Sequence, residues 1–212
     1  MLTRAYDAIM ASLQVPMITS QNVDFNNSAI DDSVLNCKNY SGTIRNLFMG
    51  IFCKEGSLGY TTSIINALAI PLAMFNTSGY NSVLLPDEEE SAPDYEDYSV
   101  ANGTPPGWTV SSQYPSFSKS YDPGTKEIVC SVTVLWQNTS GAAKTVYGVK
   151  VRCYFPYRKS YSSISNDWDY FLTCREHFAS PVVVEDQGII SLTFTWRVGR
   201  AGLVSATAAA AE

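Results

Sequence analysis

Histidine is almost absent from this chain: His177 is the only one among 212 residues. A Ser-His-Asp or Cys-His catalytic arrangement would have to use it, yet the Gly-x-Ser-x-Gly turn that often carries a catalytic serine is missing. Zinc sites usually combine histidines with paired cysteines, so a zinc site is not expected either. We interpret His177 as a surface or interface residue, with Arg175 beside it on the same face of a strand.

Paired cysteines are missing as well, since no two of the five cysteines are spaced as Cys-x-x-Cys. Their number is odd and no secretory signal is recognised, which favours free thiols buried as small hydrophobic side chains in a reducing cytosol. The residues concerned are Cys37, Cys53, Cys130, Cys153 and Cys174. The sequence therefore predicts no metal ligands, no cofactor-binding residues and no catalytic residues.

Basic clusters and long apolar runs are also lacking. The 14 Lys and Arg residues are outnumbered by 20 Asp and Glu, and they form no patch in the sequence that could neutralise nucleic-acid phosphates. The most apolar stretch, residues 64–75, is too short to span a bilayer and contains Pro71. Prolines interrupt the glycines of residues 103–107, which argues against a phosphate-binding loop. Neither nucleic acid nor a membrane is expected as a partner.

Charge of either sign is scarce, at 16% of residues, whereas aromatic residues reach 12% and include 13 tyrosines. A surface with few charges has to be covered by uncharged polar side chains or by another subunit. Tyrosine suits both, because its ring packs while its hydroxyl stays hydrated. Interfaces are enriched in aromatic residues and depleted in charge, so the composition favours a substantial protein–protein interface.

The strongest structural signal is present in residues 168–198, which read as a strand, a Ser-Pro break, a short apolar strand, a turn and a long alternating strand. The apolar positions of the last strand are Ile190, Leu192, Phe194, Trp196 and Val198. Ser, Thr and Arg occupy the positions between them, and this period of two is typical of an antiparallel strand with one buried face.

Earlier segments follow the same pattern. Residues 126–137 and 146–155 alternate, with Trp136 on the inner face and turns at 122–124 and 138–141, and a Ser-rich polar loop is expected at 157–167. Several strands separated by such turns predict an all-β fold, an antiparallel β-sandwich.

The first half of the chain is less regular. Thr3 is expected to cap a short N-terminal helix over residues 4–13, residues 43–54 suit a buried strand, and residues 63–75 suit either a strand or a helix. The predicted organisation is an N-terminal assembly segment with a helix and buried strands, an acidic Pro-rich loop, a β-sandwich core and a flexible tail. These parts cover residues 1–84, 85–107, 108–198 and 199–212.

Acidic residues and prolines are concentrated in residues 85–107, which predicts a solvated loop. The ligand spacing of an EF-hand is missing, so a calcium site is not favoured. A carboxylate pair for glycoside hydrolysis could be drawn from it, but a flexible loop would not fix their separation. A hydrolase of this kind would lose activity on neutralising Glu89 or Asp94, and we do not expect an enzyme.

Four motifs carry a resemblance. The chain opens with Met1-Leu-Thr and the expected helix; residues 92–100 read Ala-Pro-Asp-Tyr-Glu-Asp-Tyr-Ser-Val; residues 136–141 end in Asn-Thr-Ser-Gly; and Arg175-Glu precedes a Ser-Pro-Val-Val-Val strand and the alternating strand. In these features the chain resembles the minor structural, tail or head-fibre proteins of tailed bacteriophages. Val100 replaces the usual Leu, and residues 147–149 replace the usual Glu-x-Gly-Leu.

The resemblance covers mainly residues 108–198. It implies a non-enzymatic structural component of a bacteriophage virion (tail, collar or head fibre), assembled in the bacterial host cytoplasm. Such a protein would form a homo-oligomer and dock on other phage virion proteins. We expect the N-terminal segment and residues 63–75 to make contacts between subunits, because apolar surface there has no evident local cover. The alternative is a receptor- or carbohydrate-binding β-sandwich module that displays aromatic side chains such as Trp108.

Overall fold

A computed structural model describes residues 1–8, 36–46, 84–111, 116–160, 163–198 and 204–210. These residues form an all-β, antiparallel fold with one short helix at residues 4–8, as the sequence predicts. The strands are β1 (Asn36–Lys38), β2 (Ile44–Asn46), β3 (Leu84–Asp87), β4 (Trp108–Val110), β5 (Ser116–Asp122), β6 (Glu127–Asn138), β7 (Lys144–Ser160), β8 (Ser163–Val184), β9 (Ile189–Val198) and β10 (Val204–Ala210).

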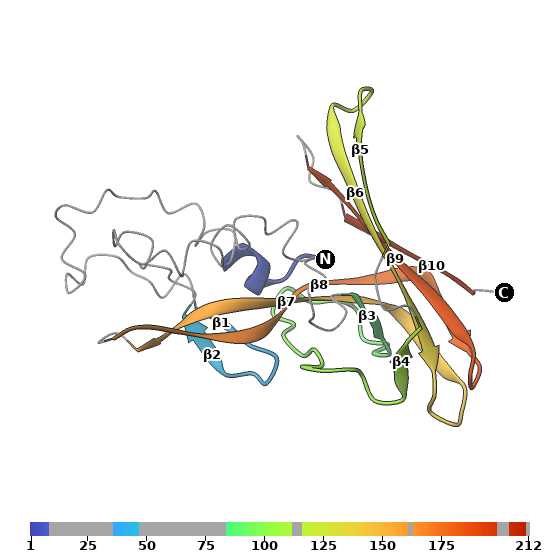
Figure 1. Cartoon of the computed structure of the whole chain (residues 1–212), viewed down its shortest axis with the longest axis horizontal. Coiled ribbons are helices and arrows are strands. Elements are labelled where there is room, and N and C mark those ends of the chain that lie inside the picture. The colour runs from blue at the N-terminus through green and yellow to red at the C-terminus, as the bar shows by residue number, and fades with distance from the viewer. Residues whose placement is uncertain (9–35, 47–83, 112–115, 161–162, 199–203, 211–212) are drawn as a thin grey trace.

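The strands form two sheets that cross each other (Figure 1). The first sheet has the order β1-β2-β7-β3, with β8 on the other side of β7. The second has the order β10-β9-β6-β4, with β5 also pairing with β6. The sheets overlap where they cross. From the crossing, the β7–β8 hairpin extends in one direction and the β5–β6 hairpin in another.

Alternation in the second sheet produces the expected buried face. Ile190, Leu192 and Phe194 are almost completely buried, and Trp196 packs against them partly exposed. On the opposite face, hydroxyl groups pair between β6 and β9, at 2.9 Å for Ser131–Thr195 and 2.8 Å for Thr133–Thr193. The side chain of Val198 lies outside the described part. The predicted orientation of β9 is thus confirmed at its described positions.

Trp136 connects the two sheets. It is fully buried, and its indole Nε1–H donates a hydrogen bond of 2.9 Å to the backbone oxygen of Leu84 in the first sheet. Burial of a tryptophan with its N–H satisfied is favourable because the ring contributes a large apolar area at no polar cost. The core on both sides of it is drawn from β3, β6, β7, β8 and β9.

The Ser-Pro break predicted in β8 is present as a bulge. Val146 pairs with Val182 and Gly148 pairs with His177, so residues 178–181 lie opposite Tyr147 alone. The two chains approach closely beside the bulge: a Cβ added to Gly148 would lie 2.1 Å from the backbone oxygen of Glu176. Glycine at position 148 is therefore required for this register.

The N-terminal residues are covered by their own chain. Ala5 and Ala8 are buried in the core, and Leu2 forms an isolated antiparallel bridge with Cys174. The premise that this segment lacks local cover is thus wrong for residues 1–8. Thr3 lies at the predicted cap position, because its backbone oxygen accepts from the helical N–H groups of Tyr6 and Asp7, but its hydroxyl donates to the Leu172 backbone oxygen. The remainder of the predicted helix, up to residue 13, lies outside the described residues.

Four further expectations differ from the structure. Residues 204–210 of the expected flexible tail form β10, which pairs with β9 and places Ala208 against the core. The expected loop at 157–167 belongs largely to the paired strands β7 and β8. Ile44 is 65% exposed, so the start of the expected strand at 43–54 is not buried. Residues 47–54 and 63–75 lie outside the described part, and the boundary expected after residue 84 falls within β3.

Candidate functional site: a buried ion cluster beneath the acidic loop

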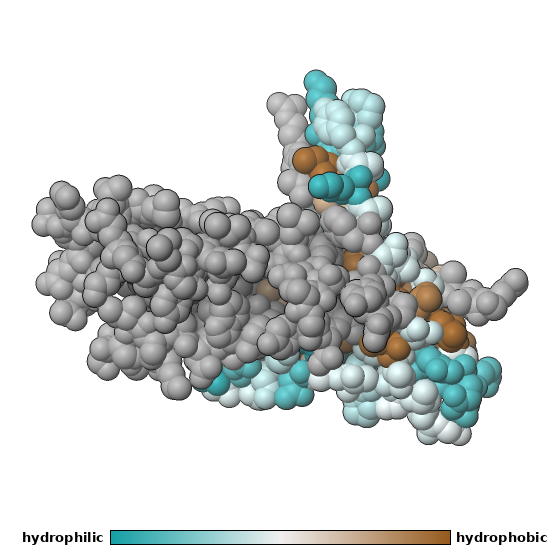
Figure 2. Space-filling view, in the orientation of Figure 1, coloured by the Kyte–Doolittle hydropathy of each residue, from teal (hydrophilic) through white to brown (hydrophobic). Residues whose placement is uncertain are grey.

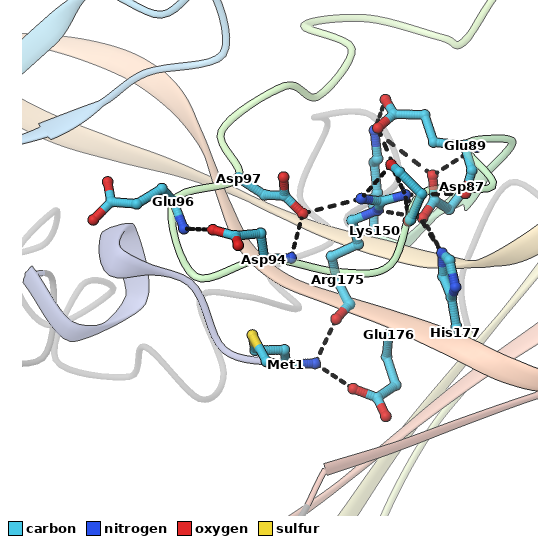
Figure 3. Close-up of polar contacts among 11 residues, drawn as sticks. Met1, Asp87, Glu89, Asp94, Glu96, Asp97, Lys150, Arg175, Glu176 and His177 are labelled. Carbon is cyan, nitrogen blue, oxygen red and sulfur yellow. Dashed lines mark hydrogen bonds and ion pairs between the residues drawn. The ribbon is translucent and has the colours of Figure 1, made fainter.

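Arg175, expected at a surface, is the centre of a buried ion cluster (Figure 3). It lies on β8 opposite Lys150 of β7, and only 1% of its surface is exposed. Alternation along β7 and β8 correctly separates two faces. However, residues 88–107 cover the face that the sequence pattern assigned to solvent, so Lys150 and Arg152 are buried as well.

The Arg175 guanidinium is satisfied by groups from β3 and the acidic loop. Its Nε donates to Asp87 Oδ2 at 2.6 Å, and its Nη1 donates to Asp97 Oδ2 at 3.0 Å. Its Nη2 donates to the backbone oxygens of Ser91 at 2.7 Å and Glu89 at 3.0 Å. Burial by itself lowers the pKa of Arg175, but the hydrogen bonds to the two aspartates outweigh it and leave the pKa raised. Arg175 is thus held in its charged form.

Asp87 is the buried anion of the cluster and is fully shielded from solvent. Besides Arg175, the Lys150 Nζ lies 3.7 Å from its Oδ1 and the His177 Nε2 lies 3.5 Å from its Oδ2. The backbone N–H of Glu89 also donates to Oδ1, at 3.1 Å. A carboxylate can be buried in this way only because several donors replace the water it has lost.

Other cations fasten the two ends of the loop. Lys144 Nζ lies 2.8 Å from both carboxylate oxygens of Glu88, and the Trp108 indole N–H donates to the same carboxylate at 2.6 Å. Farther along, Arg152 donates to the backbone oxygens of Ala101 and Gly103. Burial lowers the pKa of Arg152. The acidic segment lacks strands between residues 88 and 107, as expected for a loop, but it is tied to the first sheet at both ends and the middle.

The residues considered for hydrolysis lie on different sides of Arg175 (Figure 3). Glu89 is paired with Lys150. Asp94 is exposed, and its carboxylate accepts the backbone N–H of Glu96 at 2.8 Å, closing a turn. His177 faces Asp87, and its Nε2 lies 3.4 Å from Arg175 Nη2. In this arrangement the Glu89 carboxylate pairs with a cation and the Asp94 carboxylate closes a turn of the backbone.

The remaining candidate residues are also placed. Trp108, considered for sugar stacking, is buried and bonded to Glu88, so it is not displayed. Four cysteines are buried free thiols, as predicted, and Cys53 lies outside the described residues. Burial raises the pKa of Cys37, Cys153 and Cys174 to about 12. Within the described ranges, no three His, Cys, Asp or Glu side chains are grouped so that they could hold a metal ion.

Sequence reasoning missed Asp87, Lys150 and Arg175 as one unit. The available signal was three cations in predicted strands of a chain that also holds an acidic segment: Lys150 between two valines, Arg152 between Val151 and Cys153, and Arg175 after Cys174. The cations of these strands and the carboxylates of the acidic segment attract each other. The alternation of side chains along a strand, however, does not show which segment of the chain covers a face of the sheet.

Comparisons of this chain with known proteins identified no related protein. No protein-family model matches the chain, and searches of curated proteins and of solved structures gave no match. Among the described residues, no helix is both long and apolar enough to cross a membrane.

Proposed function

We propose that this chain is a non-enzymatic structural component of a bacteriophage virion, in the tail, collar or head fibre, which self-associates and docks on other virion proteins. The observation that carries the proposal is the arrangement of the two sheets. They cover each other at their crossing, and a hairpin from each extends beyond it (Figure 1). Extended hairpins offer side-chain and backbone surface to neighbouring subunits.

In Figure 2 the projecting β5–β6 hairpin is mostly pale and teal, with a small brown area near its stem where apolar side chains reach the surface. Tyr121 and Ile128 pair across its two strands and are 62% and 48% exposed. They continue the face that is buried farther along β6, at Val132 and Val134. An apolar face that passes from the core to the surface supports contact with another protein.

The motifs behind the phage resemblance lie at points that tie the fold together. Asn138, in the Asn-Thr-Ser-Gly turn, is fully buried, and its side-chain amide donates to the backbone oxygens of Ala142, Val184 and Glu185. It thereby joins the turn after β6 to the end of β8. Arg175, in the motif that contains the Arg-Glu pair, joins β8 to the acidic loop. These contacts support a structural role for the two motifs, in which they hold the strands and the loop in a rigid scaffold.

Light scattering of the purified protein tests the proposal in solution, because a structural subunit is expected to form an oligomer of defined mass. A strictly monomeric protein that is also absent from particles would reject it. Retention of the protein on host glycans, with no self-association, would instead favour the carbohydrate-binding alternative.

A further inference from the structure

The N-terminal residues add a short antiparallel segment to the outer edge of β8. The N–H of Thr3 donates to the Thr173 backbone oxygen at 3.1 Å, and the N–H of Arg175 donates to the Met1 backbone oxygen at 3.0 Å. Between these bonds, Leu2 is opposite Cys174. The Met1 amino group contacts Glu176 as well. Backbone pairing of this kind is the mode by which an extended segment binds a sheet edge.

The acidic loop contacts the other side of the same segment. The N–H of Arg4 donates to the Tyr95 backbone oxygen at 2.9 Å, and the Tyr95 hydroxyl donates to the Asp7 carboxylate at 3.0 Å. Arg4 Nη1 also lies 3.2 Å from Glu96 Oε1. Residues 1–8 therefore bind between β8 and the loop. We call residues 172–176 together with 95–96 the acceptor site.

The acceptor site is held in place by contacts that do not involve residues 1–8. Its loop side is held by the Arg175–Asp97 pair, and its strand side is held by pairing between β7 and β8. What residues 1–8 add is apolar burial, through Ala5 and Ala8 in the core and Leu2 and Tyr6 against it. A preformed site of this kind binds an equivalent segment equally well from any chain.

The connection between the segment and β1 is long, although Arg4 of the segment contacts the first residue of β1. Residues 9–35 join the segment to β1, although the Arg4 Nε is only 3.2 Å from the backbone oxygen of Asn36. Arg4 thus lies beside the start of β1, whereas the 27 residues of the connection, fully extended, reach about 90 Å. Chain length therefore permits the segment to bind a neighbouring molecule without any change in its contacts.

We infer that residues 1–8 are an exchangeable element, which in the self-associated protein occupies the acceptor site of a second copy of this chain. The inference rests on the proposed self-association and names its contact. The contacts are the same within one chain or between two, so local concentration decides between them. A tether gives an effective concentration in the millimolar range, and subunits packed in a particle reach a similar value.

Leu2→Cys tests the exchange, because it places a thiol opposite Cys174. Directly opposed antiparallel residues have Cα atoms about 4.5–5.5 Å apart, within the range that a disulfide spans. Equal amounts of isotopically light and heavy Leu2→Cys protein are refolded together at high concentration and oxidised. Exchange predicts disulfide-linked peptides of mixed isotope composition as abundant as unmixed ones. The double variant Leu2→Cys with Cys174→Ser is the matched control and should give neither.

A second variant covers the case in which Leu2→Cys does not fold. Arg4→Cys with Glu96→Cys changes two exposed side chains on opposite sides of the same contact, and a short bismaleimide then joins them. Mixed-isotope products in the oligomer support the exchange. An oligomer, measured by light scattering, that yields only unmixed products overturns the exchange and leaves the proposed function standing. A monomer at every concentration overturns the exchange, and if the chain is also absent from purified particles it overturns the proposed function too.

Discussion

At the scale of the residue, Arg175 shows how a buried charge is stabilised. Its three nitrogens donate to two carboxylates and two backbone oxygens. Lysine offers one charged point and cannot reproduce the planar fork of donors. The cost of losing this residue comes mainly from Asp87, whose buried carboxylate would lose its closest partner.

Arg175→Ala is therefore expected to lower the free energy of unfolding by about 3–5 kcal/mol, the range found when one partner of a buried pair is removed. Urea unfolding measures it. Arg4→Ala, which breaks an ion pair exposed on both sides, is the control and should cost at most about 1 kcal/mol. Equal losses in the two variants would show that the cluster does not stabilise the fold.

The close approach of the backbone at Gly148 predicts that a substitution there is destabilising, and Gly103 in the acidic loop provides the control. Gly148→Ala would place a methyl group 2.1 Å from the Glu176 backbone oxygen, so two strands must separate. We expect a loss of about 3 kcal/mol, at the upper end for an overpacked site. Gly103 has no atom within 4 Å of an added Cβ, and Gly103→Ala should change stability by less than about 0.5 kcal/mol. Thermal unfolding of both variants compares them directly, and similar melting temperatures would contradict the register at the bulge.

The buried thiols predict a loss of stability in alkali. Burial raises the pKa of Cys37, Cys153 and Cys174 from 9.0 to about 12, so each is neutral in the folded protein where the unfolded thiol ionises. Their contribution is complete below pH 9.0 and is lost as the pH rises toward 12, at up to about 1.4 kcal/mol per pH unit for each thiol. Urea unfolding at several pH values measures this slope. Cys153→Ala should make it shallower, and an unchanged slope would place the thiol in water.

At the scale of the element, the acidic loop owes its position to charge pairing, since residues 88–107 contain no strand. Asp97 is the residue through which the middle of the loop reaches Arg175, and it also accepts the backbone N–H of Asp94 at 2.8 Å. Local opening of such a segment has its own free energy, lower than that of global unfolding.

Asp97→Asn should therefore release the loop without unfolding the sheets. We expect a Glu-specific protease to cut within residues 88–96 about tenfold faster, equivalent to about 1.4 kcal/mol of local stability. Mass spectrometry of the fragments locates the cuts. The control Glu185→Gln, in the exposed turn after β8, should leave the loop sites as slow as before. If the Asp97→Asn variant and the unchanged protein are cut at equal rates, the loop is held by contacts other than the Arg175–Asp97 ion pair.

Sequence patterns predicted the elements whose cause is local. The inner face of β9, at Ile190, Leu192 and Phe194, follows from alternation, and the turn at 138–141 follows from its residue types. Burial of Arg175 was not predictable in this way, because its acidic partners are distant in sequence and reach it only after folding. For β10, an Ala-rich segment without strand propensity becomes a strand because β9 offers an edge.

The acidic loop is a second case in which the sequence predicted the local structure but not the contacts. Its composition correctly indicated the absence of regular structure, but composition does not report where the charges are directed. Glu89 and Asp94, the two loop carboxylates that a hydrolase would have needed, lie on different sides of the cluster. The predictions that the chain binds neither nucleic acid nor a membrane stay predictions.

At the scale of the whole molecule, the chain is a pair of crossed sheets with extended hairpins, fastened by buried polar groups. Asn138 ties the turns together at one end, and the Arg175 cluster ties the loop to the first sheet. This construction supplies rigidity at the crossing and surface on the hairpins. This construction suits a subunit that is built into a larger assembly, as we propose.

Quantitative mass spectrometry of purified phage particles, taken from a lysate in which this chain is expressed, tests the proposed structural role. We expect peptides of this chain to remain with the particles through density-gradient purification and a high-salt wash, in a fixed ratio to the major shell protein. A chain that is abundant in the lysate but missing from washed particles, or present in a ratio that varies between preparations, would rule out a structural role in the virion.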